Sequence, residues 1–253
     1  MIPIVSSDFP SKHFIVTVGR TGSSLLCAVL ADASADFGMK APEDWDPRRG
    51  VMENFELRRA AHHYRRAWDI DHGRLFKLSP VLESKWRRYL GRRCLARALT
   101  QAQFFKGSDV DLITQPVFKL GYLPKLILSY RGPQATLASL LVGRTHTGPD
   151  QLASEYVRVY RQGIALLRCF GGCVVPYAEL KSGSFDWRTI AELTGLAEKQ
   201  LIVAAAHRNA GGEEEAMEGS PYPEADQIFD ALQEMRGLVV PASRQIGRVL
   251  GEG

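Results

Sequence analysis

Short apolar runs rich in β-branched residues alternate along the chain with longer stretches that favour helices. The short runs predict strands at residues 13–19, 103–106, 126–130 and 173–176. The longer stretches predict helices at residues 25–30, 55–97, 133–141, 151–170, 186–196 and 226–250, the last with a break at Pro241. Strands that alternate with helices predict an α/β protein of three layers, α/β/α, with a central parallel sheet.

A site is expected in the loops that follow the predicted strands, because ligands of parallel sheets bind beyond the carboxyl ends of the strands. The first such loop, residues 19–24, reads G-R-T-G-S-S between a strand and a helix. Its glycines allow a tight turn, the new helix directs N–H groups outward, and Arg20, Ser23 and Ser24 add further donors. The loop predicts a site for a phosphate-like anion, although a glycine turn followed by a serine-capped helix would have the same composition.

This loop differs from the G-x-x-x-x-G-K-[ST] loop of nucleotide triphosphatases, since no lysine precedes the hydroxyl pair. No predicted strand ends in an obvious aspartate that would hold magnesium. Both features count against a nucleoside triphosphate as the ligand. They favour a diphosphate-type donor that binds without metal.

The loop after residues 126–130 carries a second cationic group, Arg131, with Ser139 eight residues further on. Pro133 fits the first position of the helix that follows. Ser139 then lies nearly two turns into that helix, and the long Arg131 side chain can fold back to share one phosphate with it. Taken alone, an arginine at a strand end is often only part of a surface ion pair.

Together the two loops resemble those of the sulfotransferases that use 3′-phosphoadenosine 5′-phosphosulfate (PAPS). In that family a [K/R]-[S/T]-G-[S/T]-[S/T] loop binds the 5′-phosphosulfate, and residues 20–24 match it. A later strand of the family ends in an arginine with a serine eight residues on, and both bind the 3′-phosphate. Arg131 and Ser139 match this second motif. Arginine at the position of Arg20 is common in the bacterial and tyrosylprotein branches, so a bacterial-type member is expected.

Further stretches agree with this resemblance. Residues 177–180 (Y-A-E-L) are similar to a Tyr-Glu-Asp-Leu segment whose tyrosine, here Tyr177, contacts adenine, and residues 187–196 resemble the segment that follows it. Lys106 lies about where the family has a basic residue near the transferred group. Residues 47–54 (P-R-R-G-V-M-E-N) resemble the N-P-K-G-[YF]-x-E-N stretch of bacterial members. The resemblance covers most of residues 13–196 and implies the P-loop-like architecture of the sulfotransferases.

The resemblance also implies roles for individual residues. Sulfuryl transfer builds negative charge on the leaving phosphate, and Arg20 is expected to stabilise it, with Lys106 at the sulfuryl oxygens. The residues expected to bind PAPS or its product 3′,5′-ADP are Arg20, Thr21, Gly22, Ser23, Ser24, Arg131, Ser139, Tyr177 and Arg208. No metal is expected in this chemistry.

The chain departs from the cytosolic animal branch of the family at two places. Ser108 stands where that branch has a catalytic histidine, so another group must accept the proton of the acceptor hydroxyl. The Arg-Lys-Gly triplet that closes over the 3′-phosphate near the C-terminus is absent. Arg208, next to His207, belongs to the one basic cluster in a comparable place.

A carboxylate or an imidazole within hydrogen-bond reach should act as the base. Glu53 is the first candidate and Glu43 the second, because bacterial and heparan-type relatives use a glutamate soon after the first helix. An exposed or helix-capping acid stays the alternative for both. His62 and His63 lie in the basic helical stretch and are expected at the surface or in packing.

Composition and length limit the number of domains and the kinds of partner, but they do not indicate a function. The chain has 253 residues, of which 45% are hydrophobic, so it can form one large globular domain, and on length alone also two small ones. With the resemblance, a single sulfotransferase-like domain over residues 1–253 is expected, with residues 197–253 outside the clear resemblance. The 32 basic residues include 23 arginines against 28 acidic residues, so the net charge is +4. This excess is modest: a mild affinity for nucleic acid or membranes would be compatible with it, but no nucleic acid is predicted as a partner.

The compartment is predicted from cysteine usage and from targeting signals. Four cysteines in a chain of this length are expected to be reduced structural thiols. The N-terminal residues show neither the basic start nor the apolar stretch of a signal peptide, and no apolar run is long enough to span a membrane. A cytoplasmic protein is therefore expected.

The resemblance implies a sulfotransferase that moves a sulfuryl group from PAPS to a hydroxyl of a small molecule, glycan or lipid. Two alternatives stay open: a divergent P-loop kinase that uses ATP, and a catalytically inactive module that binds a nucleotide or another protein. The acceptor pocket is expected within residues 39–83 and after residue 196. Four aromatic residues either line this pocket or belong to the core, namely Trp45, Tyr64, Trp68 and Trp86.

Overall fold

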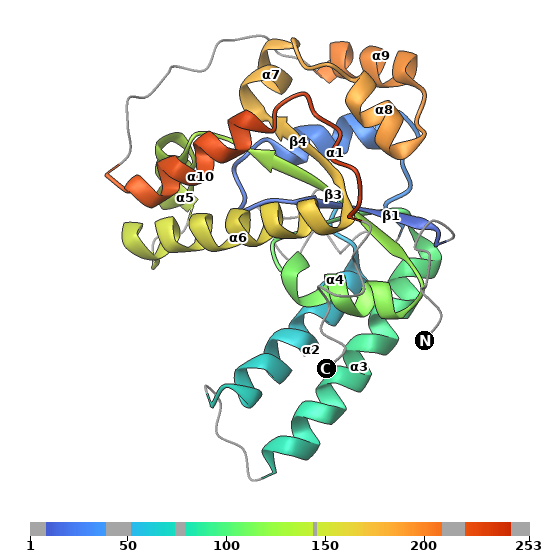
Figure 1. Cartoon of the computed structure of the whole chain (residues 1–253), viewed down its shortest axis with the longest axis vertical. Coiled ribbons are helices and arrows are strands. Elements are labelled where there is room, and N and C mark those ends of the chain that lie inside the picture. Colours follow the sequence, from blue (N-terminus) through green and yellow to red (C-terminus); the bar gives the residue numbers. More distant parts are fainter. Residues whose placement is uncertain (1–8, 39–51, 74–78, 144–145, 209–220, 244–253) are drawn as a thin grey trace.

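The computed structural model describes residues 9–38, 52–73, 79–143, 146–208 and 221–243. Within these residues, four strands form one sheet with helices on both sides (Figure 1). The elements in chain order are β1 (Ser11–Val16), α1 (Ser23–Asp32), α2 (Phe55–Asp71), α3 (Pro80–Gln101), β2 (Phe104–Gly107), α4 (Val110–Lys119), β3 (Leu123–Tyr130), α5 (Pro133–Gly143), α6 (Pro149–Phe170), β4 (Gly172–Pro176), α7 (Tyr177–Ser182), α8 (Arg188–Thr194), α9 (Glu198–Arg208) and α10 (Pro223–Glu234).

The strands pair in the order β2-β1-β3-β4, and all three pairings are parallel. Phe14 in the middle of β1 lies opposite Phe105 of β2 on one side and Leu126 of β3 on the other. The predicted α/β fold, three layers around a central parallel sheet, is confirmed.

The two faces of the sheet follow from the alternation of side chains along each strand. Phe14 and Val16 of β1 belong to the core beneath α2, α3, α4, α6 and α10. Ile15, between them, belongs to the core beneath α1, α7, α8 and α9. Both faces are covered, and this explains why the strands are nearly continuous apolar runs.

The chain leaves neighbouring strands β1 and β3 toward opposite faces of the sheet. After β1 it enters α1 on one face, whereas after β3 it passes through α5 to α6 on the other, where Leu137 and Leu140 of α5 pack on Leu152. Loops that diverge in this way open a crevice at the carboxyl ends of the strands. The crevice here lies between the loops that carry Arg20 and Arg131.

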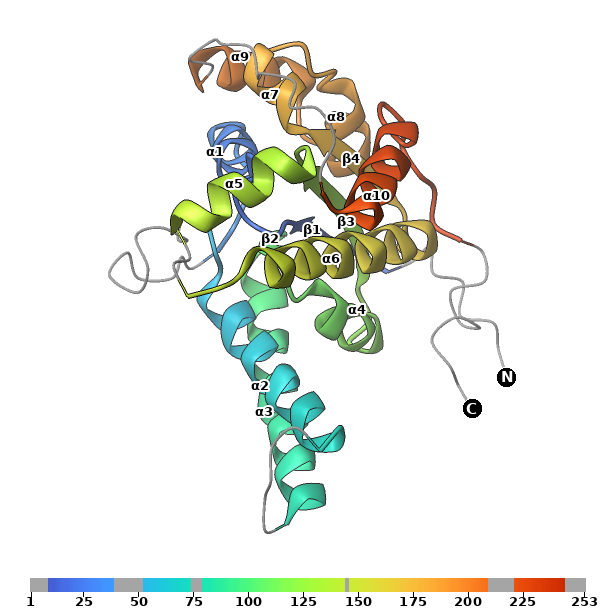
Figure 2. The same ribbon diagram turned by 90° about the vertical axis from the view of Figure 1, so that its left-hand side faces the viewer.

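Helices α2 and α3 form a hairpin that projects from the body of the molecule (Figure 2). They account for the predicted helical stretch 55–97, which is interrupted after Asp71. The helices approach closely at Gly91, where a Cβ atom would lie 3.1 Å from the ring of Tyr64. The ring of Tyr64 is therefore part of the packing between the two helices.

Two predicted elements are wrong at their ends. Strand β1 stops at Val16 rather than Gly19, because the buried Thr17 hydroxyl accepts a hydrogen bond from the amide of Gly19 (2.9 Å) and turns the chain. Helix α10 stops at Glu234, so the prediction of a helix over residues 226–250 fails from there to residue 243. The chain instead extends and forms an antiparallel bridge between Val240 and Gly172. Residues 244–250 lie outside the described residues.

The remaining predicted helices are found close to their expected positions, and α8 ends at Gly195, which has a left-handed φ of 76°. The four cysteines are free thiols. Helices α9 and α10 pack against α1 and α6, while a single domain over residues 1–253 stays a prediction. No helix within the described residues has both the length and the apolar character needed to cross a membrane.

Candidate active site

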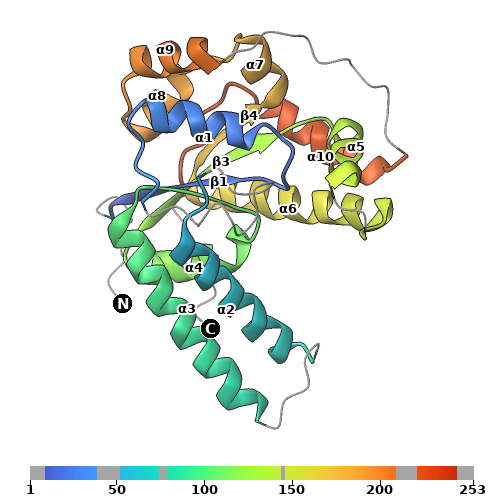
Figure 3. The ribbon, with the colours of Figure 1, turned by 180° about the vertical axis from the view of Figure 1, so that it is seen from behind.

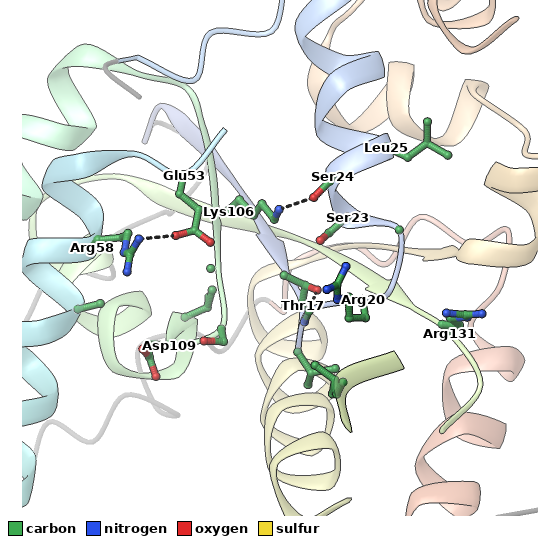
Figure 4. A pocket seen from close by; sticks show the side chains of 18 of the residues that line it. Thr17, Arg20, Ser23, Ser24, Leu25, Glu53, Arg58, Lys106, Asp109 and Arg131 are labelled. Carbon is green, nitrogen blue, oxygen red and sulfur yellow. Dashed lines mark hydrogen bonds and ion pairs between the residues drawn. The ribbon is translucent and has the colours of Figure 1, made fainter. Parts of the chain in front are cut away.

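A cleft of about 770 Å³ opens at the carboxyl ends of β1, β2 and β3 (Figure 4). Its walls come from the loops after these three strands, from residues near the starts of α1, α2 and α4, from Ser139 and Leu140 of α5, and from Tyr177. Residues far apart in sequence, such as Arg20, Glu53 and Arg131, therefore line one space. The predicted site residues that line it are Arg20, Gly22, Ser23, Ser24, Glu53, Lys106, Arg131, Ser139 and Tyr177.

The loop after β1 has the backbone geometry of an anion site. Gly19, Arg20 and Gly22 all have left-handed φ values, of 88°, 58° and 75°. Successive turns of this kind direct neighbouring N–H groups toward one point. Helix α1 begins directly afterwards, with no side-chain hydrogen bond at its Gly22 N-cap, so its first amides are open to a ligand.

Hydrogen bonds beneath the loop hold this geometry. The hydroxyl groups of Thr17 and Thr21 lie 2.8 Å apart, and Ser129 at the end of β3 donates a hydrogen bond to the carbonyl of Thr21 (2.8 Å). Thr21 is fully buried and does not line the cleft. Thr21 was expected to bind the ligand, but in the structure its side chain is turned down toward Thr17 and supports the loop from below.

Lys106 brings a third cation to the same end of the sheet. It lies on the edge strand β2, is buried, and its Nζ atom donates a hydrogen bond to the hydroxyl of Ser24 (3.0 Å). Figure 4 shows Lys106 and Glu53 on one side of Arg20, and Arg131 on the other. The ammonium group thus stands at the first turn of α1, next to the N–H groups of the loop.

The end of β3 is held in place by buried tyrosines of α6. The Tyr160 hydroxyl donates a hydrogen bond to the carbonyl of Ser129 (2.6 Å), and the Tyr156 hydroxyl donates one to the carbonyl of Arg131 (3.0 Å). Burial raises the pKa of both phenols, so they stay neutral donors. This support fixes the backbone from which the Arg131 side chain extends.

Tyr177 lies between the two cationic loops. The guanidinium of Arg131 stacks over its ring, 4.9 Å from the centroid. On the other loop, a Cβ atom at Gly22 would lie 2.1 Å from the Tyr177 ring, so only glycine allows this approach. Tyr177 was expected only as a contact for adenine. In the structure its ring also links the two loops and orients Arg131.

Glu53 lies at the opposite end of the cleft, just before α2. Its carboxylate pairs with Arg58 at 3.2 Å, and its side chain is 17% exposed. Asn54 caps α2 by accepting a hydrogen bond from the amide of Leu57 (3.0 Å), which fixes the start of the helix beside Glu53. The other candidate base, Glu43, lies outside the described residues.

Several residues of the cleft were not predicted. Apolar side chains of α2 and α4, including Leu57 and Ile113, form an apolar wall of the cleft. Asp109 also lines this part of the cleft and pairs with Arg65 of the hairpin. Asp109 follows strand β2, so its place at the carboxyl end of a parallel strand is the sequence signal that points to it.

Arg208 is not part of the cleft. It lies at the end of α9 and forms two hydrogen bonds with Asp32, of 2.7 and 3.0 Å. Asp32 ends α1, whereas the anion loop precedes the start of that helix, so a whole helix separates Arg208 from the cleft. The structure therefore does not bring Arg208 together with the other residues expected to bind the nucleotide.

The candidate aromatic residues for the acceptor do not line the described part of the cleft. Tyr64 packs inside the hairpin, Trp68 stacks on His72 at 4.0 Å, and Trp86 is exposed. Trp45 lies outside the described residues. For Tyr64 the structure thus bears out the alternative that it belongs to the core.

Comparisons with known proteins give few matches. No family model matches the sequence, and a search of curated proteins finds no match. Among solved structures, the chain is similar to the sulfotransferase domain of the Synechococcus PCC 7002 olefin synthase, with a TM-score of 0.47, 16% identity, and coverage of 96% of this chain and 94% of that one. It is similar to the sulfotransferase domain from the curacin biosynthetic pathway, with a TM-score of 0.46, 14% identity, and coverage of 96% and 97%. The match to sulfotransferase domains thus extends over nearly the whole chain.

Proposed function

We propose that the protein is a PAPS-dependent sulfotransferase. The observation that carries this proposal is that two cationic loops, after β1 and β3, line one cleft with Tyr177 between them. A ligand that carries an anion at each end matches this arrangement. The sequences of both loops resemble those with which PAPS sulfotransferases bind the two ends of their donor.

The residues fit such a donor. The backbone amides around Gly22 and the hydroxyls of Ser23 and Ser24 form a cradle for the 5′-phosphosulfate. Arg131 and Ser139 line the other part of the cleft and would bind the 3′-phosphate. When bound, PAPS supplies a sulfuryl group attached to a good leaving phosphate.

The protein's own groups would then favour transfer in two ways. Arg20 and Lys106 bring fixed positive charge to the loop, where it stabilises negative charge that develops on the leaving phosphate and on the sulfuryl oxygens. The apolar wall formed by Leu57 and Ile113 excludes water from the space beside them and leaves room for an acceptor.

Glu53 is our assignment for the general base. It lies on the acceptor side of the cleft, and Arg58 holds its carboxylate in place. A carboxylate in this position can accept the proton of an acceptor hydroxyl as the oxygen attacks sulfur. Asp109 lines the same part of the cleft and is the competing carboxylate.

Calorimetry against three nucleotides tests the donor. Tight binding of 3′,5′-ADP without metal is expected, together with much weaker binding of 5′-AMP. Arg131→Ala should weaken 3′,5′-ADP by about 10- to 100-fold, the value of a charge-assisted hydrogen-bond pair, and leave 5′-AMP nearly unchanged. Arg188→Ala is the matched control, because Arg188 is an exposed arginine of α8 that does not line the cleft.

The same titrations separate the other functions. Equal affinity for 3′,5′-ADP and 5′-AMP would contradict a site that reads the 3′-phosphate. Magnesium-dependent binding and turnover of ATP would indicate a kinase. Binding of 3′,5′-ADP without transfer of labelled sulfuryl from PAPS to any component of a cell extract would indicate an inactive nucleotide-binding protein.

A further inference from the structure

The positive charge of the chain is concentrated in the stretch that forms the hairpin. Residues 55–101 contain 12 of the 32 basic residues and 4 of the 28 acidic ones, a net charge of +8. The rest of the chain is therefore net negative, at −4. Because the positive charge is concentrated on the projecting hairpin, an anionic partner would be attracted to the hairpin rather than to the rest of the molecule.

The outer face of α3 combines this charge with apolar side chains. Leu82, Trp86, Tyr89 and Arg93 recur at helical spacing and lie on one face. Leu82, Trp86 and Tyr89 are 68%, 55% and 50% exposed. Figure 3 shows the first turns of α3 beside α2 in the projecting part of the hairpin, far from the sheet. Three large apolar side chains exposed side by side on a projecting element indicate an interaction site.

The aromatic and basic side chains of this face are organised together. The rings of Trp86 and Tyr89 stack with centroids 5.5 Å apart, and the guanidinium of Arg93 lies over the Tyr89 ring at 5.8 Å. Lys85 and Arg92 are exposed on its flank. Glu83 is the one acidic residue in the sequence of α3, and it pairs with Arg87 at 2.8 Å.

This face is not needed to hold the hairpin together. The buried residues of α3, among them Gly91, Leu95 and Ala98, lie on the opposite side of the helix and pack toward α2 and the sheet. The outer aromatic residues are therefore available to a partner without any rearrangement of the fold.

The geometry points to the surface of an anionic membrane as the partner of the α3 outer face (Leu82, Lys85, Trp86, Tyr89, Arg92 and Arg93). Arginine and lysine would bind lipid phosphates and carboxylates, while tryptophan and tyrosine insert at the level of the headgroups. A second copy of the chain fits poorly, because it would bring two strongly positive faces together. A nucleic acid would give the exposed Leu82 no apolar partner.

Sedimentation with lipid vesicles tests this proposal, which does not depend on the reaction proposed above. The full chain should bind vesicles of phosphatidylcholine containing about one third phosphatidylserine, and bind pure phosphatidylcholine far more weakly. Arg92→Glu/Arg93→Glu should weaken binding by about 30-fold or more, since each basic residue near such a surface contributes about 1 kcal/mol. Trp86→Ala/Tyr89→Ala should weaken it by about tenfold through lost apolar burial.

Two matched controls use exposed residues of the opposite layer. Arg188→Glu/Lys199→Glu lowers the net charge by the same amount as the arginine variant, and Ile202→Ala/Val203→Ala removes exposed apolar side chains of α9. Both should bind anionic vesicles like the wild type, and thermal melting should show all four double variants folded.

Three results would overturn the proposal. The first is no binding of the wild type to anionic vesicles, or binding that both hairpin variants retain. The second is loss of binding in the arginine variant alone, which would mean that the attraction is purely electrostatic and that Trp86 and Tyr89 do not enter the lipid surface. The third is a dimer in solution that Trp86→Ala/Tyr89→Ala converts to a monomer, which would assign the face to self-association.

Discussion

Lysine side chains lie at both ends of the central sheet, with Lys12 and Lys106 buried and Lys125 half-buried, but their surroundings differ. At the amino ends, Lys12 donates a hydrogen bond to the carbonyl of Ala102 (2.7 Å), and Lys125 donates one to the carbonyl of Phe170 (3.2 Å). At the carboxyl ends, Lys106 donates to the hydroxyl of Ser24 in the anion loop. The two ends therefore use the same type of side chain against different acceptors.

The acceptors explain the difference. Ala102 follows α3 and Phe170 ends α6, so the amino-end lysines satisfy carbonyl groups that helix ends leave without partners. Burial lowers the pKa of both Lys12 and Lys125. Lys106, by contrast, lines a cleft. A buried cation indicates a binding site only where its surroundings leave space for a ligand.

The largest effect is expected from removing the proposed base. Glu53→Gln should lower the rate of sulfuryl transfer by about 10²- to 10⁴-fold, because the amide cannot accept the proton of the acceptor. Affinity for 3′,5′-ADP should stay within about threefold of the wild type, since Glu53 lies away from the 3′-phosphate loop. Transfer is followed with labelled PAPS and cell extract.

Asp109→Asn is the comparison for this variant, because Asp109 lines the same part of the cleft. A small effect of Asp109→Asn beside a large effect of Glu53→Gln supports the assignment. The reverse pattern would move the base to Asp109, and full activity in both would point to Glu43.

A pair of lysine variants tests the contrast between the two ends of the sheet directly. Lys106→Met should lower the transfer rate by about 10²- to 10³-fold, as expected when one fixed donor to a developing charge is removed. Lys125→Met should leave the rate almost unchanged and lower the free energy of unfolding by about 1 kcal/mol, through the lost bond to Phe170. Rates and denaturant titrations of both variants are needed. Equal loss of activity in both variants would contradict the view that Lys106 acts in the cleft and Lys125 only stabilises the fold.

The amino end should also make stability depend on pH through His13. Burial, followed by the neighbouring charges of Lys125 and Lys12, lowers the pKa of His13 to about 4. In the unfolded chain this imidazole is protonated near pH 6.5. The contribution of His13 to the free energy of unfolding is therefore fully present above pH 6.5 and is lost as the pH falls toward 4. The expected loss is on the order of 3 kcal/mol.

His13→Leu should remove this pH dependence, because leucine carries no titratable group. The variant should still fold, since the ring of His13 packs on Phe104 and its buried Nδ1 has no hydrogen-bond partner in the described structure. Denaturant titrations between pH 7 and pH 4 measure the slope in both proteins. An unchanged slope in the variant would show that His13 is protonated in the folded state.

The smallest difference expected, about 2 kcal/mol, is between alanine variants of two glycines. Gly22→Ala should lower the free energy of unfolding by about 3 kcal/mol, because Cβ adds contact with Tyr177 to the strain of a left-handed φ. Gly121→Ala should cost only about 1 kcal/mol, since its φ is also left-handed (84°) but nothing lies within 4 Å of the new Cβ. Thermal or chemical denaturation compares them, and equal losses would mean that Tyr177 moves away freely.

The fold and the two anion loops could be predicted from the sequence, because both depend on residues that are close together along the chain. Apolar runs such as the one through Phe14, Ile15 and Val16 determine a strand by their own composition, and a glycine-serine turn before a helix determines where amides point. The rule that parallel strands end at one edge then predicts that Arg20 and Arg131 lie near one another, and both line one cleft.

Only the tertiary structure decided which other side chains meet. Thr21 belongs to the loop motif, yet its hydroxyl bonds to Thr17 below the cleft, while Asp109 enters the cleft from a loop with no recognised motif. Arg208 is basic and suitably placed in sequence, but Asp32 binds it at the far end of α1. Contacts of this kind depend on how elements distant in sequence pack. Sequence spacing describes the neighbours of a residue along its own strand or helix and not those that packing brings to it.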